Sequence, residues 1–153
     1  MPRTTEGLSF VACDVEVSQD GSTWIDLSCY GSSIAVAGGD RTTGEVNVFC
    51  DERPIVKAGK KASQDLTIRY IYTEELGASA PFTNMRTWDD TEGGVIYARY
   101  WPKGKVAGNF CFSTGQAIIT SFLDPQGEAG AGDPVLCEIA IKTEQLTKTI
   151  WVS

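Results

Sequence analysis

The sequence predicts a mainly β protein, a β-sandwich or barrel with one short flanking α-helix. Apolar and polar residues alternate with a period of two along most of the chain, which is typical of strands that bury one face. Turn signals rich in glycine and proline separate these segments, and only one segment has the spacing of a helix. The 153 residues contain no linker, repeat or shift in composition, so we expect a single domain over residues 1–153.

The expected strands follow one another along the chain. The first lies at residues 11–17, where apolar side chains occupy every second position. The Asp20-Gly21 pair then predicts a hairpin, because glycine adopts a positive φ at little cost. Two later segments alternate in the same way, at residues 66–72 and 135–142.

Two runs are apolar on both faces, at residues 95–101 and 117–123. Such runs fit central strands, or strands with one face in the core and the other against a partner. The total is about ten short strands, which is typical of a sandwich or barrel.

One segment predicts a short helix, because residues 82–88 carry large apolar side chains at a spacing of three. Ser79 is the expected N-terminal cap, and Pro81 suits the first turn. Gly93 and Gly94 are expected to end this helical segment.

Charge and composition argue against several functional classes. The chain has 13 basic and 20 acidic residues and a net charge of −7, and its one dense basic stretch, Lys57–Lys61, is short. Proteins that bind nucleic acid tightly concentrate basic residues, so we expect this chain to bind no nucleic acid. No apolar run approaches the roughly 20 residues that span a bilayer, and the N-terminus lacks the apolar core of a secretory signal. We therefore expect neither a membrane segment nor secretion.

The residues that would support catalysis or cofactor binding are also missing. The sequence has no histidine, which excludes nucleophile systems based on Ser-His or Cys-His. Its five cysteines are widely spaced, so we expect reduced thiols that fill the core rather than zinc ligands. We expect no enzyme activity, cofactor or metal, although paired carboxylates leave a small hydrolase as an open alternative.

A glycine-rich stretch at residues 127–132 reads G-x-x-G-x-G and could suggest a phosphate-binding loop. A phosphate loop opens a helix, whereas here Pro134 and an expected strand follow. Glu128 and Asp133 would also repel a phosphate. A hairpin loop is therefore the favoured interpretation, and the same holds for Gly38–Asp40.

Several short signatures occur in an order that resembles the major tail (tail tube) proteins of long-tailed bacteriophages of the siphophage type. Each signature is weak alone, and the resemblance covers about Asp20 to the C-terminus. The signatures are G-D-R-x-T-G-E-V at 39–46, P-I-V-x-A-G-K-K at 54–61, W-P-K-G at 101–104, and P-Q-G-E at 125–128 followed by D-P at 133–134.

The resemblance implies a β-sandwich or barrel of tail-tube type and a structural role in the virion. Such proteins form hexameric rings that stack into a hollow tube, in which strands of neighbouring subunits join into one barrel. The implied partners are further copies of the chain, a tape measure protein and tail terminator and tip proteins. The tube would assemble in the host bacterial cytoplasm and pass DNA without binding it. No catalytic residues carry over.

Three long segments are candidates for contacts between subunits or rings: Gly38–Thr43, Asp51–Lys61 and Pro125–Asp133. Ordinary exposed loops remain the alternative. The candidate contact residues are Gly38, Gly39, Asp40, Arg41, Arg53, Lys57, Lys60, Lys61, Gln126, Glu128 and Asp133. The candidate acids on the channel wall are Asp14, Glu16, Glu45 and Asp65.

A second functional hypothesis stays open at this point. A monomeric β-sandwich that binds carbohydrate or acts in adhesion would have the same fold class and would use exposed tryptophans and tyrosines. A planar row of such side chains on the surface would favour it.

Overall fold

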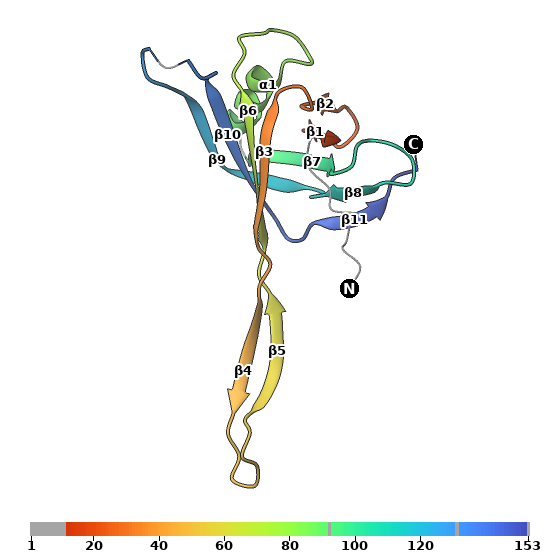
Figure 1. The fold of residues 1–153 in the computed structure, drawn as a ribbon, viewed down its shortest axis with the longest axis vertical. Helices are drawn as coiled ribbons and strands as arrows, with labels where there is room; N and C mark the ends of the chain where they lie inside the picture. Colours follow the sequence, from red (N-terminus) through yellow and green to blue (C-terminus); the bar gives the residue numbers. More distant parts are fainter. Residues whose placement is uncertain (1–11, 92, 131, 153) are drawn as a thin grey trace, which may run out of the picture.

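The computed structural model describes residues 12–91, 93–130 and 132–152. The described chain forms two sheets that share one strand, one helix at the edge of this body, and a long hairpin that leaves the body (Figure 1). The strands are β1 (Asp14–Ser18), β2 (Ile25–Asp26), β3 (Gly31–Gly38), β4 (Arg41–Val46), β5 (Ile55–Lys61), β6 (Gln64–Ile71), β7 (Val95–Trp101), β8 (Phe110–Ser113), β9 (Ala117–Gln126), β10 (Leu136–Thr143) and β11 (Thr147–Ile150), and the helix is α1 (Pro81–Asp90).

Strand β7 connects the two sheets. It pairs with β1 over Tyr97–Trp101, with β8 at Arg99 and Tyr100, and with β9 at Val95 and Ile96, always antiparallel. The smaller sheet contains β2, β1, β7, β8 and β11, and the larger sheet continues from β7 through β9, β10 and β6 to β3. The sequence run at 95–101 is thus a central strand, as its two apolar faces predict.

The core lies between the two sheets and follows the predicted alternation. In β6, Leu66, Ile68 and Tyr70 are buried, and in β10 the buried residues alternate in the same way. Because the two strands pair in register, these side chains meet as one layer. The expected strands at 66–72 and 135–142 are therefore confirmed, whereas Val11 lies outside the described residues.

Helix α1 covers one end of the core. Pro81 occupies its first turn as predicted, but the N-cap is Ala80 rather than Ser79, and no side chain caps the helix. Met85 and Trp88 are buried, and Phe82 packs partly against the core. The apolar spacing of three therefore identified the helix correctly, although the cap was wrong.

The turn between β1 and β2 is the hairpin that Asp20-Gly21 predicts. Gly21 has a φ of 81°, and the Asp20 carboxylate accepts hydrogen bonds from the backbone N–H groups of Ser22 and Thr23, each 2.9 Å long. These bonds, led by the one from Thr23, hold the pKa of the Asp20 carboxyl well below its usual range.

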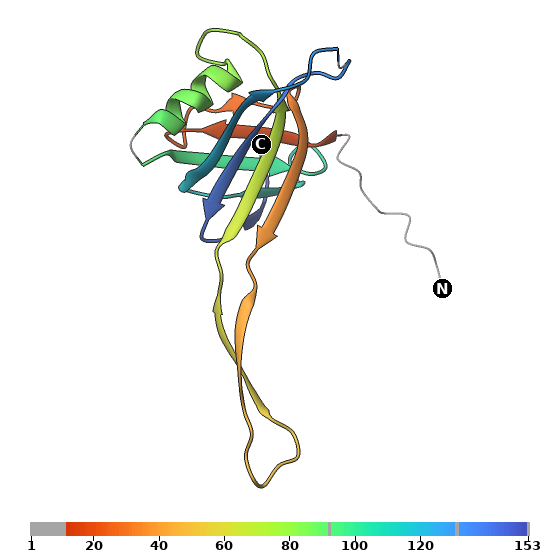
Figure 2. The same cartoon turned by 90° about the vertical axis from the view of Figure 1, so that its left-hand side faces the viewer.

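The long hairpin is formed by β4 and β5, which continue from β3 and β6 (Figure 2). We call residues 40–61 the arm. Gly38 and Gly39 both have a φ of 81° where β3 passes into the arm. Every residue of β4 and β5 is exposed, so the arm contributes nothing to the core.

The prediction of loops at Gly38–Thr43 and Asp51–Lys61 is wrong, because the arm contains two paired strands. Most of these residues belong to paired strands, and the loop expected at Pro125 begins within β9. The strands were missed because both of their faces are exposed, so no period-two alternation marks them. The candidate contact residues that lie in strands are Arg41, Lys57, Lys60, Lys61 and Gln126, together with Gly38 at the end of β3.

The cysteines are all free thiols, as expected, but they do not all fill the core. Cys111 and Cys137 are buried, whereas Cys29 and Cys50 are exposed. Burial, with a smaller effect of the nearby Asp124 charge, raises the pKa of the Cys137 thiol to about 11. In the described part of the chain, no helix is long and apolar enough to cross a membrane.

Candidate assembly surfaces

The arm exposes apolar side chains that nothing in the subunit covers. Phe49 near its tip is fully exposed, Val46 is 63% exposed and Val56 is 55% exposed. An isolated two-stranded hairpin is at best marginally stable in water. The arm is therefore suited to be covered by another molecule.

The arm also carries cations without an anionic partner. None of its five basic residues forms an ion pair among the residues that the structure describes. Arg41 lies directly opposite Lys61 across the two strands, and like charges in that position repel. The basic residues are Arg41, Arg53, Lys57, Lys60 and Lys61.

Apart from the edge at the two-residue β2, two sheet edges are open. In the described residues, β3 and β11 end the chain of paired strands, and each has a neighbour on one side only. An open edge presents unpaired N–H and C=O groups that can pair with a strand of another chain. Residues Ser32 to Gly38 of β3 are mostly exposed, so this edge is accessible along its length.

The larger sheet has an outer face that points away from the core. Asp65 lies on this face in β6, opposite Lys142 of β10, with 3.8 Å between the Asp65 Oδ1 and Lys142 Nζ atoms. A second pair joins Arg69 to Glu138 at 2.9 Å. Large apolar side chains are exposed next to these pairs, since Ile118 lies opposite Lys142 and Leu123 lies opposite Glu138. Of the four candidate channel acids, Asp65 alone lies on this face.

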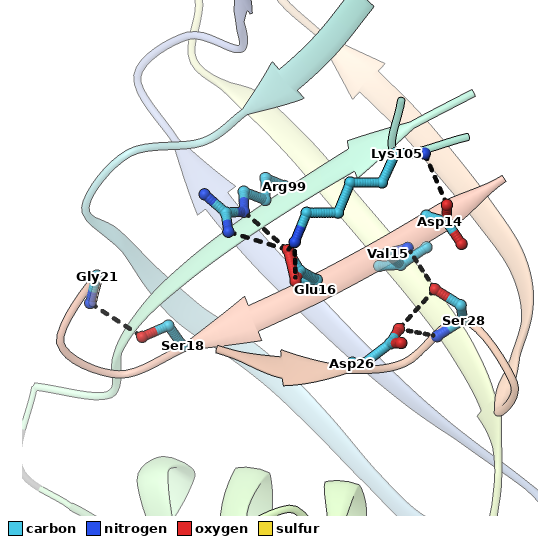
Figure 3. Close-up of polar contacts among 9 residues, drawn as sticks. All are labelled: Asp14, Val15, Glu16, Ser18, Gly21, Asp26, Ser28, Arg99 and Lys105. Atoms are coloured by element: carbon cyan, nitrogen blue, oxygen red, sulfur yellow. Dashed lines mark hydrogen bonds and ion pairs between the residues drawn. The ribbon is translucent and has the colours of Figure 1, made fainter. Parts of the chain in front are cut away.

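Glu16 has a different environment from the one expected. Its side chain is only 10% exposed, and its carboxylate accepts hydrogen bonds from Arg99 Nη2 at 2.9 Å and from Lys105 Nζ at 3.1 Å (Figure 3). Because its carboxylate is engaged inside the subunit, Glu16 cannot line a channel. The alternation that placed it on an open strand face could not show that a loop covers that face.

Aromatic rings complete this cluster. The Arg99 guanidinium lies 3.8 Å from the ring centre of Trp24, and both Arg99 and Lys105 lie within 5.5 Å of the Trp101 and Trp151 rings. Cations over aromatic faces are attracted to the ring quadrupole. The cluster thus ties the C-terminal strand and the loop after β7 to β1.

The four candidate channel acids do not gather at one place. Asp14 lies beside Glu16 and accepts the backbone N–H of Lys105 at 2.7 Å. Glu45 is on the arm, and Asp65 is on the larger sheet. The structure therefore brings only Asp14 and Glu16 together, as part of an internal cluster.

The end of the body opposite the arm is acidic. The connections β6–α1 and β9–β10 both lie there, as the two views agree (Figures 1 and 2). They contain Glu74, Glu75, Glu128 and Asp133 and no lysine or arginine. We call these two connections the acidic end. Glu128 and Asp133, both candidate contact residues, are exposed in it.

Two other classes of site have no support in the geometry. Among the described residues, no group of three or more His, Cys, Asp or Glu side chains could hold a metal ion. The tryptophans form no planar row on the described surface, because Trp88 and Trp101 are buried and the other two pack on Arg99.

Solved structures share this arrangement of strands. A chain of the PVC sheath-tube complex, an extracellular contractile injection system in its extended state, aligns with a TM-score of 0.70 at 14% identity, over 96% of this chain and 94% of that chain. The SPP1 tail tube aligns with a TM-score of 0.61 at 12% identity, over 96% of this chain and 81% of that chain. The chain has the tail tube fold.

The tail tube fold recurs in a chain from the tail of an empty GTA particle, with a TM-score of 0.57 at 12% identity, over 90% of this chain and 93% of that chain. No family model matches the sequence, and no curated protein matches it. Sequence identities this low show a shared fold and nothing more. The tail tube fold is therefore recognised by its arrangement of strands. The fold class predicted from the sequence is confirmed.

Proposed function

We propose that the chain is a structural virion protein that assembles with further copies of itself into the tube of a phage tail. The observation that carries the proposal is the combination of a tail tube fold with two open sheet edges and an uncovered arm. Each of these features is a liability in a lone molecule, because open edges and exposed apolar side chains promote association. Assembly of identical copies would cover the open edges and the exposed apolar side chains at the same time.

In this proposal the subunits form hexameric rings, and the rings stack. Pairing between the open edge of β3 and an edge strand of the next subunit would close each ring without leaving an edge. The arm, together with the acidic end, would make contacts between copies. A tape measure protein and tail terminator and tip proteins are the proposed partners, with the virion tail as the location and assembly in the host bacterial cytoplasm.

The proposed tube passes DNA without binding it and catalyses no reaction. Six copies carry a formal charge of six times −7, or −42, and the part of this charge that faces the channel would repel phosphates within the screening length of about 8 Å at physiological salt. The outer face of the larger sheet is the proposed lining, with Asp65 as its candidate acid. Asp14 and Glu45 lie elsewhere in the subunit and fit this lining less well than Asp65.

The proposal is tested by imaging the purified full-length protein over a range of concentrations. We expect negative-stain electron microscopy to show rings of uniform diameter or tubes with a central channel. Sedimentation should show a matching shift from monomer to large species. A protein that remains monomeric at high concentration, both alone and with the tape measure protein from the same genome, would contradict the proposal.

A further inference from the structure

The core of the subunit is uncovered beside β3. Val36 lies on the face of β3 that points into the core, because it sits directly opposite the buried Leu66 of β6. Its side chain is nevertheless 43% exposed, whereas Leu66 is 1% exposed. Across a hollow from Val36, the rings of Tyr100 and Phe112 stack with their centres 5.3 Å apart. The two sheets therefore do not close over Val36.

A groove runs along this open side of the core. It begins as a hollow of about 140 Å³ between Ile34 of β3 and the residues Cys13 and Val15 at the start of β1. A larger hollow of about 360 Å³ follows between Val36 and Tyr100. The two hollows are adjacent, since Ile34 and Val36 are alternate residues of one strand and Val15 pairs with Tyr100. A groove that is elongated along a strand suits an extended chain better than a compact ligand.

The larger hollow also contains two charges of opposite sign. Lys61 and Glu144 line it, and neither forms an ion pair among the residues that the structure describes. A ligand with charges of one sign only would be repelled by one of these two residues. The groove therefore fits a peptide that carries apolar side chains together with one charge of each sign.

The chain itself carries such a peptide next to the groove. Residues 1–11, MPRTTEGLSFV, directly precede the described chain, and Cys13 lines the smaller hollow. Leu8 and Phe10 are alternate residues, so an extended backbone places them on one side. At about 3.4 Å per residue, Phe10 reaches about 10 Å from Cys13, and Leu8 reaches about 17 Å. This reach covers both hollows, because alternate residues of a strand are only about 7 Å apart.

We propose that residues 1–11 fold back into the groove of their own subunit and cover the open side of its core. Phe10 fills the smaller hollow and Leu8 fills the larger one, and the burial of these two side chains drives the docking. The chain's own segment is favoured over a separate peptide, because a tethered segment has a high effective concentration at the groove. The inference concerns the free subunit and goes beyond the proposed tube.

The charges of the segment agree with this placement. Arg3 and Glu6 are its only charged side chains, and they have opposite signs, as the two charges of the larger hollow do. Glu6 lies two residues before Leu8, so the docked segment brings it to the rim of the larger hollow, beside Lys61. Arg3 lies further along the segment and pairs with Glu144.

Limited digestion of the full chain with chymotrypsin tests the proposal, because this protease cleaves after accessible Phe and Leu residues. Phe49 is fully exposed between β4 and β5 and provides an internal reference. In wild-type protein, at a concentration that keeps it monomeric, cleavage after Leu8 and Phe10 should be at least about tenfold slower than after Phe49. The reason is that a covered segment must open before the protease can bind it.

A charge placed in the groove should release the segment. Val36→Glu should bring the rate of cleavage after Leu8 to within about threefold of the rate after Phe49, because burial of the unpaired carboxylate is costly. Ala35→Glu is the matched control, since it adds the same charge at an exposed neighbour on the opposite face of β3. This control should keep the protection. Cleavage after Phe49 and tryptophan fluorescence should be the same in both variants, which shows that the fold is intact.

Substitutions in the segment itself give a second measurement. Leu8→Asp with Phe10→Asp should lower the melting temperature by about 4 °C or more, because two apolar side chains no longer cover the core. Thr5→Asp with Ser9→Asp adds the same charge on the other side of the extended segment. It should change the melting temperature by less than about 2 °C.

Four outcomes would overturn the inference. Wild-type cleavage as fast after Phe10 as after Phe49 would show an uncovered segment. Protection that appears only as the protein concentration rises would assign the groove to a neighbouring copy. Equal protection in the Val36→Glu and Ala35→Glu variants would place the segment elsewhere on the subunit, and equal melting temperatures of the two segment variants would show that Leu8 and Phe10 are not buried. Tube formation is measured separately and does not decide among these outcomes.

Discussion

At the scale of single residues, Glu16 shows how a charge becomes part of the interior. Two cations share its carboxylate, and three indole rings lie against them, so the ions are paired and Glu16 and Arg99 are largely removed from water. A buried ion pair stabilises little by itself, but removing one partner leaves an unpaired charge. The cluster therefore makes the fold sensitive to changes at position 16.

Replacing Glu16 with Gln should lower the free energy of unfolding by about 3 kcal/mol, because Arg99 and Lys105 lose the anion between them. Glu138→Gln is the matched control, since its pair with Arg69 is more exposed than the Glu16 cluster and contributes about 0–1 kcal/mol. Urea unfolding of both variants, followed by tryptophan fluorescence, measures the difference. Equal losses would show that the cluster is no more important than a surface pair.

At the scale of elements, the junction of body and arm depends on backbone geometry. Gly38 has a φ of 81°, and a Cβ atom there would lie 2.5 Å from the carbonyl oxygen of Ser63. Both conditions exclude a side chain, and the Ser63 oxygen is fixed because it also accepts the N–H of Gly39. Glycine at this position therefore sets the angle at which the arm leaves β3.

Gly38→Ala should destabilise the subunit by about 2 kcal/mol, since a left-handed conformation with a side chain costs 1–2 kcal/mol before any clash. Gly44→Ala, in the middle of β4, has no atom within 4 Å of its new Cβ and should change stability by less than about 0.5 kcal/mol. Thermal unfolding of the two variants checks the contrast. A Gly38→Ala protein as stable as the Gly44→Ala protein would contradict it.

The elements of the body could be predicted from the sequence, whereas the arm could not. Strands β6 and β10 bury one face, so Leu66 and Ile139 fall into a readable period. The strands of the arm bury neither face within the subunit, so the residues around Val56 show no period to read. The acidic end was hidden for a different reason, because the meeting of connections that are distant in the sequence depends on the tertiary fold.

At the scale of the whole molecule, the fold separates three surfaces that an assembly needs. The open β3 edge, the outer face of the larger sheet and the arm lie on different parts of the subunit. The resemblance to tail tube proteins rests on the order of short signatures, and solved structures at 12–14% identity share the fold that this resemblance implies. The site residues were predicted less well, since Glu16 proved internal.

The proposed lining can be tested at the scale of the whole molecule. Asp65→Lys places a cation beside Lys142 on the outer face of the larger sheet, and tubes of this variant should retain linear duplex DNA that wild-type tubes do not. Glu144→Lys, an equal change of charge between β10 and β11, serves as the control. Nuclease protection of DNA in purified tubes measures retention, and equal protection in all three samples would place the lining elsewhere.

The glycine junction has one more consequence, which concerns how tubes of this kind vary. Beyond Gly39 the hairpin shares no core contact with the rest of the subunit, so residues can be inserted in pairs on its two strands without disturbing the sheets. In the proposed tube, the axial repeat of the stack and the diameter of its rings would then be set by separate parts of the polypeptide. Lengthening the hairpin would alter the first and leave the second unchanged.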